Sequence, residues 1–123
     1  MADTEGWTAW FRAVVSARPT DGGREIGLMG GVRFTETVLA AEEDERYVYR
    51  VDETNLRGIE ALAEEWRITP LSCGGSRIQW TVAADAPASV RVLLRYARPG
   101  LGHAFRDAVH ALDRRLATAR TTA

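Results

Sequence analysis

The sequence is poor in several features that would point to particular classes of protein. It has a single cysteine, Cys73, which excludes a disulfide within the chain and any cysteine-rich zinc site. Its 16 basic residues, all of them arginine, are balanced by 17 acidic ones, so the net charge is −1. A nucleic-acid-binding surface would require a basic excess. We therefore expect no nucleic-acid partner, no metal site and no cofactor.

Long apolar segments are also missing. No apolar run approaches the ~20 residues that a membrane helix requires, so we expect no membrane insertion. Residues 1–5 have neither the basic nor the apolar region of a signal peptide, which predicts a cytoplasmic protein. At 123 residues the chain has the length of a single domain, predicted over residues 1–123, and can bury a sizeable core.

A long amphipathic helix is predicted over residues 101–116. Its large apolar residues follow one another at steps of three or four, which is the spacing of one helix face. They are Leu101, Phe105, Val109, Leu112 and Leu116. An isolated helix of this length is marginal in water, so the apolar stripe needs a surface to pack on. A shorter helix is expected over residues 86–96, separated from the long one by a break at Pro99 and Gly100.

Six segments before the helix have the pattern of β-strands. They span residues 13–17, 25–29, 32–41, 46–52, 61–69 and 76–84. Apolar and polar residues alternate in the later strands, so one face is expected to be buried and the other wet. Short turns between the strands indicate an antiparallel meander, and a twisted sheet of this width tends to curl. The pattern predicts an α+β fold in which a curved antiparallel sheet of about six strands wraps around the long C-terminal helix.

Three motifs follow one another in the chain. The first is W-x-x-W-F-x-x-V at residues 7–14, and the second joins E-x-V at 36–38 to R-Y-x-Y-R-V at 46–51. The third is a hairpin with E-W-R-I-T-P at 65–70 and R-I-Q-W-T at 77–81. In order and spacing these motifs resemble the START-like (SRPBCC, helix-grip) superfamily, specifically its polyketide cyclase/dehydrase-like branch, over residues 3–117.

The resemblance implies a helix-grip fold, in which the sheet grips the C-terminal helix over an apolar cavity. Members of the superfamily include polyketide aromatases and cyclases, lipid and hormone carriers, and chaperone-partner domains. The superfamily has no universal catalytic motif, so the resemblance implies no catalytic residue in this chain.

The N-terminus departs from the family pattern. That pattern begins with a strand and a helix before the W-x-x-W-F motif, whereas Met1 comes almost directly before it here. We expect either a start site placed inside the gene or a protein that lacks the first strand. In the family that strand would pair with the last one, residues 76–84, so its absence would expose an edge. An exposed edge predicts a homodimer through the last strand, a domain swap or poor solubility.

Polar residues in phase with the apolar faces are the catalytic candidates. Glu36 and Glu64 are predicted to point toward the helix, and Tyr47 and Tyr49 point the same way from the strand between them. Burial would raise the pKa of such carboxyl groups, as in general acids and bases. Glu36, Glu64 and Tyr49 are therefore candidates for enolising or dehydrating a polyketone, with Glu as base and Tyr as proton donor. Alternatively, the two glutamates are structural, paired with arginines or hydrated near strand ends.

The predicted ligand contacts are the inward aromatic and polar side chains. Three aromatic residues at the start of the chain form either a core plug or the lid or floor of a pocket. The predicted ligand-binding residues are Trp7, Trp10, Phe11, Phe34, Glu36, Tyr47, Tyr49, Glu64, Trp66, Trp80 and Phe105. The predicted function is binding of a small hydrophobic molecule, lipid-like or aromatic, between the sheet and the C-terminal helix. The alternative is a polyketide cyclase or dehydratase with an inward Glu/Tyr acid–base pair, and a protein-interaction role for the outer sheet face ranks third.

Overall fold

The computed structural model describes residues 1–122; Ala123, the last residue of the predicted domain, lies outside the described residues. Six strands form one antiparallel sheet in which every strand pairs with its neighbour in the sequence. The strands are β1 Val14–Thr20, β2 Gly23–Leu28, β3 Val32–Glu42, β4 Arg46–Thr54, β5 Ala61–Pro70 and β6 Ser76–Asp85. Helix α1, Trp7–Trp10, precedes the sheet, and helix α2, Ala88–Thr122, follows it. The predicted α+β helix-grip architecture is confirmed.

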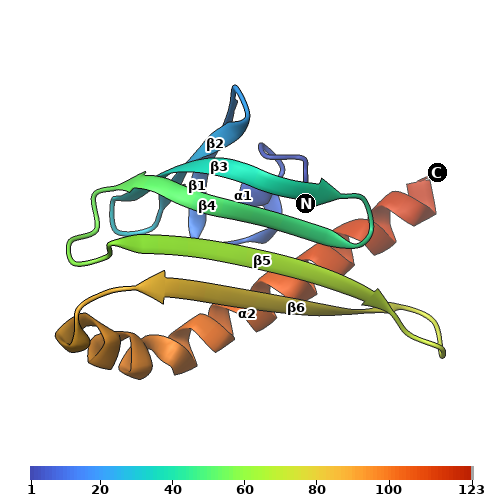
Figure 1. Ribbon diagram of the computed structural model, residues 1–123. Helices are drawn as coiled ribbons and strands as arrows, with labels where there is room; N and C mark the ends of the chain where they lie inside the picture. The colour runs from blue at the N-terminus through green and yellow to red at the C-terminus, as the bar shows by residue number, and fades with distance from the viewer. Residues whose placement is uncertain (123) are drawn as a thin grey trace.

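Both helices lie on the same side of the curved sheet (Figure 1). Helix α2 begins beside the end of β6 and crosses diagonally behind the sheet, and α1 lies behind the strands nearer the N-terminus. The Phe105 ring of α2 lies 5.9 Å from the Trp66 ring and 6.1 Å from the Trp80 ring, between centroids. Arg115 of α2 donates a hydrogen bond of 3.0 Å from Nη1 to the carbonyl of Gly6, just before α1. Side-chain contacts thus hold the second half of α2 against both the sheet and α1.

The alternation predicted for the strands is present. In β4, Tyr47, Tyr49 and Val51 are buried, whereas Arg50 and Asp52 between and after them are exposed. Because a strand's side chains point to opposite faces in turn, the buried set faces α2. The face toward α2 is therefore where an interior site can form.

The predicted break at Pro99 and Gly100 is wrong, because α2 is one continuous helix. A proline removes one backbone N–H and crowds the carbonyl four residues earlier, here that of Arg95, which costs roughly 3 kcal/mol in a helix interior. Residues 95–100 are exposed, so water can hydrogen-bond the freed carbonyl. Figure 1 shows the helix axis bending between its first turns and the remainder, which is the usual effect of an interior proline. No helix within residues 1–122 is long and apolar enough to cross a membrane.

The two edges of the sheet are β1 and β6. β1 continues beyond its predicted end at residue 17 and includes Pro19. A residue without an N–H is tolerated there, because one side of an edge strand has no strand to bond. β6 has no second strand partner among the described residues, and most of its side chains are exposed.

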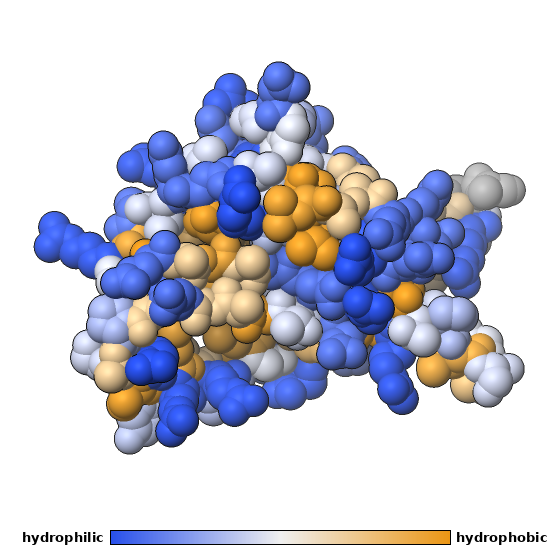
Figure 2. Space-filling model, viewed as in Figure 1, coloured by the Kyte–Doolittle hydropathy of each residue, from blue (hydrophilic) through white to orange (hydrophobic). Residues whose placement is uncertain are grey.

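The sheet face turned away from α2 is largely hydrophilic (Figure 2). Blue surface dominates this view, with apolar patches between the charged groups. Arg50 pairs with Asp52 at 2.7 Å, and Arg67 pairs with Glu65 at 3.2 Å. Exposed pairs of this kind contribute little to stability and mark a solvated surface.

Candidate functional site

Strand register arranges the inward side chains of β4, β5 and β6 in three rows. Each row holds one residue from each strand, and neighbours within a row are register partners. The aromatic row is Tyr47, Trp66 and Trp80; the middle row is Tyr49, Glu64 and Val82; the aliphatic row is Val51, Leu62 and Ala84. The middle row therefore separates an aromatic part of the interior from an aliphatic part.

The aromatic row is tightly covered. Trp7 packs edge-to-face on Trp66 with 5.5 Å between ring centroids, and Phe11 packs on Trp80 at 5.8 Å. Trp10 lies 5.7 Å from Trp66, and the latter is 0% exposed. These rings fill the space between the sheet and the helices, which is the arrangement of a core plug. Ligand contact at these aromatic residues stays a prediction.

A buried ion pair joins β2 to β3. Nε of Arg24 donates a hydrogen bond to the Glu36 carboxylate, and the two side chains are only 1% and 2% exposed. The guanidinium also lies 4.1 Å from the ring centroids of Trp7 and Tyr49, a cation–π arrangement. Nη1 of Arg24 is buried without a hydrogen-bond partner among the described residues. Glu36 is thus paired with an arginine, as the structural alternative expected.

Burial dominates the protonation of Glu36. It raises the pKa of Glu36 to about 7, even though the adjacent Arg24 charge and hydrogen bond act in the opposite direction. The nearby carboxyl of Glu64 adds to the increase. Desolvation disfavours the charged form, so a buried carboxyl can hold its proton near neutral pH despite a cationic partner.

Arg24 is a central residue that the sequence analysis missed. The predicted second strand began at residue 25, whereas β2 begins at Gly23. Counting back in steps of two from the apolar residues Leu28 and Ile26 places Arg24 on the inward face. This alternation could have identified Arg24 as an inward-facing residue. It was missed because the glycines before Arg24 were interpreted as part of a turn.

The structure brings Tyr49 and Glu64 together. The Tyr49 hydroxyl donates a hydrogen bond to the Glu64 carboxylate, and Nε1 of Trp66 donates one of 3.2 Å to the Tyr49 oxygen. Glu64 is partly exposed, whereas Tyr49 is buried. Both side chains therefore point inward, as expected, and they are hydrogen-bonded to each other.

Both groups of this pair have raised pKa values. Burial raises the pKa of Glu64, opposed by the hydrogen bond from Tyr49 and by the charge of Arg24. The indole N–H of Trp80 also favours the carboxylate, although its geometry falls short of a hydrogen bond. Burial and the neighbouring Glu64 hold the pKa of Tyr49 well above its ordinary value. The pair thus consists of a phenol that keeps its proton and a carboxyl group whose raised pKa makes its carboxylate a stronger base than that of an ordinary glutamate.

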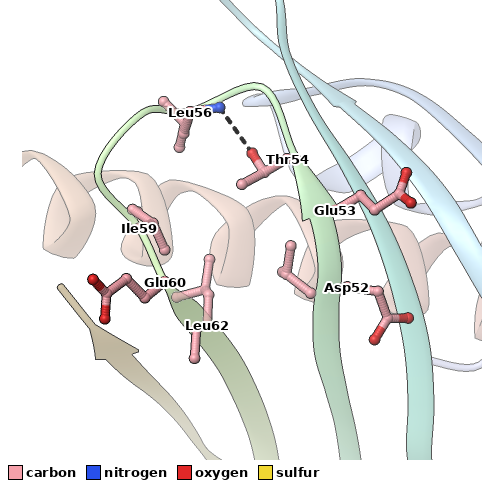
Figure 3. A pocket seen from close by; sticks show the side chains of 9 residues that line it. Asp52, Glu53, Thr54, Leu56, Ile59, Glu60 and Leu62 are labelled. Carbon is pink, nitrogen blue, oxygen red and sulfur yellow. Dashed lines mark hydrogen bonds between the residues drawn. The ribbon is translucent and has the colours of Figure 1, made fainter.

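A pocket of about 440 Å³ lies beside the aliphatic row, at the loop between β4 and β5 (Figure 3). We refer to it as the loop pocket. Its apolar lining consists of Val51, Leu56, Ile59, Ala61 and Leu62, and its polar lining of Asp52, Glu53, Thr54 and Glu60. Figure 3 shows Ile59 and Leu62 pointing into the space in front of α2, and Asp52 and Glu53 pointing away from it. The volume is within the range of small-molecule sites, roughly 300–1,000 Å³.

The loop that borders this pocket rests on the start of α2. A side chain at Gly58 would place its Cβ 2.7 Å from Cγ2 of Val90, and the residue has a φ of +82°. Both the backbone conformation and the close approach therefore require glycine. The loop is thus held close to the first turn of α2.

Apolar surface next to the pocket is left uncovered. Residues seven apart share a helix face, so Leu94 and Leu101 are in phase with Ala108, which is 0% exposed. Yet Leu101 is 41% exposed and Leu94 only half-buried. On the sheet, the inward-facing Val82 of the middle row is also 41% exposed. The first half of α2 and the sheet thus face each other without complete packing, unlike the second half.

The pocket-lining residues differ from those predicted to bind ligand. None of the predicted residues lines the loop pocket, and Phe34 lines a second hollow, of about 450 Å³, over β1 to β3. Leu56 and Ile59 were missed because residues 54–60 read as a polar loop. Two aliphatic side chains within a short polar segment were the signal for a contact with the interior.

One family model covers nearly the whole chain. The family described as "Polyketide cyclase / dehydrase and lipid transport" matches residues 1–117. The chain belongs to this family. The START-like resemblance inferred from the three motifs is thereby confirmed.

The similar proteins described below support the fold but indicate no activity. Uncharacterized proteins of Mycobacterium bovis and Mycobacterium tuberculosis are 30% identical over 121 residues, which covers 93% of this chain and 72% of theirs. A START superfamily protein from Mycobacterium smegmatis has a TM-score of 0.68 at 14% identity, covering 96% of this chain and 85% of its own. The Bacillus cereus protein XoxI has a TM-score of 0.70 at 13% identity, covering 89% and 78%. These likenesses establish the shared helix-grip fold.

Proposed function

We propose that this family member binds a small hydrophobic molecule, lipid-like or aromatic, between the first half of α2 and the inner face of the sheet. The observation that carries the proposal is the uncovered apolar surface on both sides of this space. Leu94 and Leu101 line it from the helix and Val82 from the sheet, next to the loop pocket. Apolar side chains that face each other without packing gain free energy when an apolar ligand displaces water from them.

The expected affinity is moderate. Removing apolar surface from water contributes about 25 cal/mol per Å², so a ligand that buries ~200 Å² of it gains about 5 kcal/mol. Association and ordering of the ligand consume part of this gain. We therefore expect dissociation constants of about 0.2 mM or weaker for simple apolar probes, and tighter binding for a ligand that also satisfies polar groups.

The test compares two tryptophan substitutions on the same helical turn. Leu94→Trp fills the space between α2 and the sheet, whereas Leu93→Trp places the same ring on a position that is 67% exposed. Binding of a naphthalene probe, followed by calorimetry, should be lost in Leu94→Trp and retained in Leu93→Trp. Native mass spectrometry of the purified protein would show any retained ligand. Equal binding by both variants would place the ligand elsewhere and contradict the proposal.

A second candidate function rests on the hydrogen bond between Tyr49 and Glu64. In a polyketide cyclase or dehydratase, Glu64 would remove a proton next to a carbonyl group and Tyr49 would donate a proton to the carbonyl oxygen. The raised pKa of Glu64 suits the role of base, and the raised pKa of Tyr49 keeps the phenol protonated, so that it can donate a hydrogen bond to the carbonyl oxygen as negative charge develops there. The pair lies in the row that borders the open part of the interior, where a bound polyketone would be within reach.

The enzymatic candidate requires loss of turnover without loss of binding. Glu64→Gln and Tyr49→Phe should each abolish conversion of a poly-β-ketone analogue, measured by mass spectrometry of the products, while the analogue still binds. An unchanged product spectrum for wild type and both variants would remove this candidate and leave the binding function.

A further inference from the structure

The interior holds more carboxyl groups than cations. The ionisable groups that surround Glu64 are Arg24 of β2, Glu36 of β3 and Tyr49 of β4, with the indole of Trp80 beside it on β6. The interior cluster therefore contains one cation and two carboxyl groups. Arg24 is committed to Glu36 by an ion pair in which both side chains are almost fully buried. Glu64 has a phenol as its hydrogen-bond partner and forms no ion pair within residues 1–122.

Glu64 also occupies the position where a bound molecule would end. It lies in the middle row between Tyr49 and Val82, and Val82 is 41% exposed. The aromatic row on one side is filled by packed rings, whereas the aliphatic row on the other side borders the loop pocket. An apolar molecule that enters from the loop pocket would therefore meet Glu64 where the open space stops. Leu101 lies about one helical turn before Phe105, whose ring contacts Trp66 and Trp80 of the aromatic row, and it supplies apolar surface from the helix.

A carboxyl group in this position distinguishes ligands by their polar end. A partly buried carboxylate without a cation is costly, and a donor or cation from a ligand would compensate it. A ligand carboxylate in the same place would bring two like charges together in a medium that screens them poorly. Arg24 does not reverse this preference, because its guanidinium is enclosed by Glu36 and by the rings of Trp7 and Tyr49.

We propose that Glu64 is the polar anchor of the binding site and selects apolar ligands that end in a hydrogen-bond donor, foremost a protonated amine, over ligands that end in a carboxylate. The proposal rests on the proposed binding function and adds the chemical class of the ligand. The rim of the loop pocket supports the same preference, because Glu60 lies on it and forms no ion pair among the described residues. Hydrogen bonds that involve a charged group contribute more than neutral ones, which corresponds to a tenfold to hundredfold difference in affinity.

The experiment measures binding of three probes with the same apolar body. Decylamine, decanol and decanoate are titrated calorimetrically into the wild-type protein at pH 7, below their aggregation concentrations. We expect decylamine to bind about ten- to a hundredfold more tightly than decanoate, with decanol between them. Decanoate binding as tightly as decylamine would overturn the proposal, and this comparison needs no variant.

Two substitutions then assign the preference to one carboxyl group. Glu64→Gln should bring the three affinities within about threefold of one another, whereas Glu65→Gln should leave their order unchanged. Glu65 provides the matched control, because it lies next to Glu64 in β5 and pairs with Arg46 and Arg67 outside the interior. A preference that survives Glu64→Gln would belong to the pocket rim and overturn the assignment.

The outcomes also separate this inference from the proposed function. If none of the three probes binds, the proposed function fails and this inference fails with it. If all three bind with similar affinity, the binding function stands and the role of Glu64 as selective anchor is refuted. Circular dichroism melting of Glu64→Gln verifies that the variant is folded before its affinities are compared.

Discussion

Removal of the buried Arg24 charge should destabilise the fold more than removal of any exposed arginine. The substitution Arg24→Met keeps an unbranched apolar side chain but leaves Glu36 without its cation. Loss of one partner from a buried ion pair typically costs 3–5 kcal/mol, because the remaining charge is uncompensated. The lost stacking on Trp7 and Tyr49 is part of this cost. We therefore expect the free energy of unfolding to fall by about 3–5 kcal/mol at pH 9.

The loss should depend on pH in a defined direction. In the wild-type protein the pKa of Glu36 is about 7, above its ordinary value of 4.5. Without Arg24 this pKa rises further, so Glu36 avoids part of the cost by remaining protonated at low pH. As the pH rises above neutral, keeping Glu36 protonated in the folded variant costs more free energy relative to the unfolded chain. This cost grows by at most about 1.4 kcal/mol per pH unit. The destabilisation caused by Arg24→Met should accordingly be smaller at pH 6 than at pH 9.

The assay is urea unfolding followed by tryptophan fluorescence at these two pH values. Arg18→Met is the matched control, because Arg18 forms an exposed pair with Glu25 in the same hairpin and its loss should change stability little. The double substitution Arg24→Met/Glu36→Leu should recover most of the stability, since an apolar pair can replace a buried ion pair at little cost. The reasoning would be refuted if Arg24→Met cost no more than Arg18→Met, or if the double variant were as unstable as Arg24→Met.

Three further predictions concern the pKa of Glu36, the close approach of Gly58 to α2, and Pro99 within α2. Glu36→Gln should flatten the decline in wild-type stability that accompanies a rise in pH from about 4.5 to about 7, because a raised folded-state pKa stabilises the fold only while the group is protonated; urea unfolding across this range measures it. Gly58→Ala should cost about 1 kcal/mol more than Gly30→Ala in thermal unfolding, because both residues have a φ of +82° but the new Cβ meets a neighbour, Val90, at position 58 alone. Pro99→Ala should raise hydrogen-exchange protection in residues 88–98 and stabilise α2 by up to about 3 kcal/mol, and unchanged protection would show that the proline does not limit this part of the helix.

The sequence was sufficient for the order and faces of the strands, because side-chain alternation is a local property of the backbone. Tyr49 and Glu64 could be placed on the inward face from their phase alone. Their hydrogen bond could not be predicted, since it depends on the register between β4 and β5, which brings the two residues side by side. Arg24 was missed for a related reason. Its inward position followed from phase, but its partner Glu36 is its register neighbour on β3.

The continuity of α2 could not be predicted from the local sequence. Pro99 predicts a break because it lacks an N–H and crowds the preceding turn. The helix nevertheless continues, since the surrounding positions are exposed and water can hydrogen-bond the freed carbonyl. The loop pocket depends on tertiary structure to a greater degree. It lies between the ends of β4 and β5 and the loop that joins them, and Gly58 lets this loop approach Val90 of α2.

What the sequence by itself determined is therefore the class of fold and the set of residues that face inward, both consequences of periodicity along one chain. The tertiary structure alone decided which inward residues are packed and which remain available to a ligand. The aromatic side chains predicted to contact a ligand fill the interior between themselves, because rings from α1, the sheet and α2 meet there. The aliphatic end stays open because packing depends on the distance between elements, and no pattern within a single strand or helix encodes that distance.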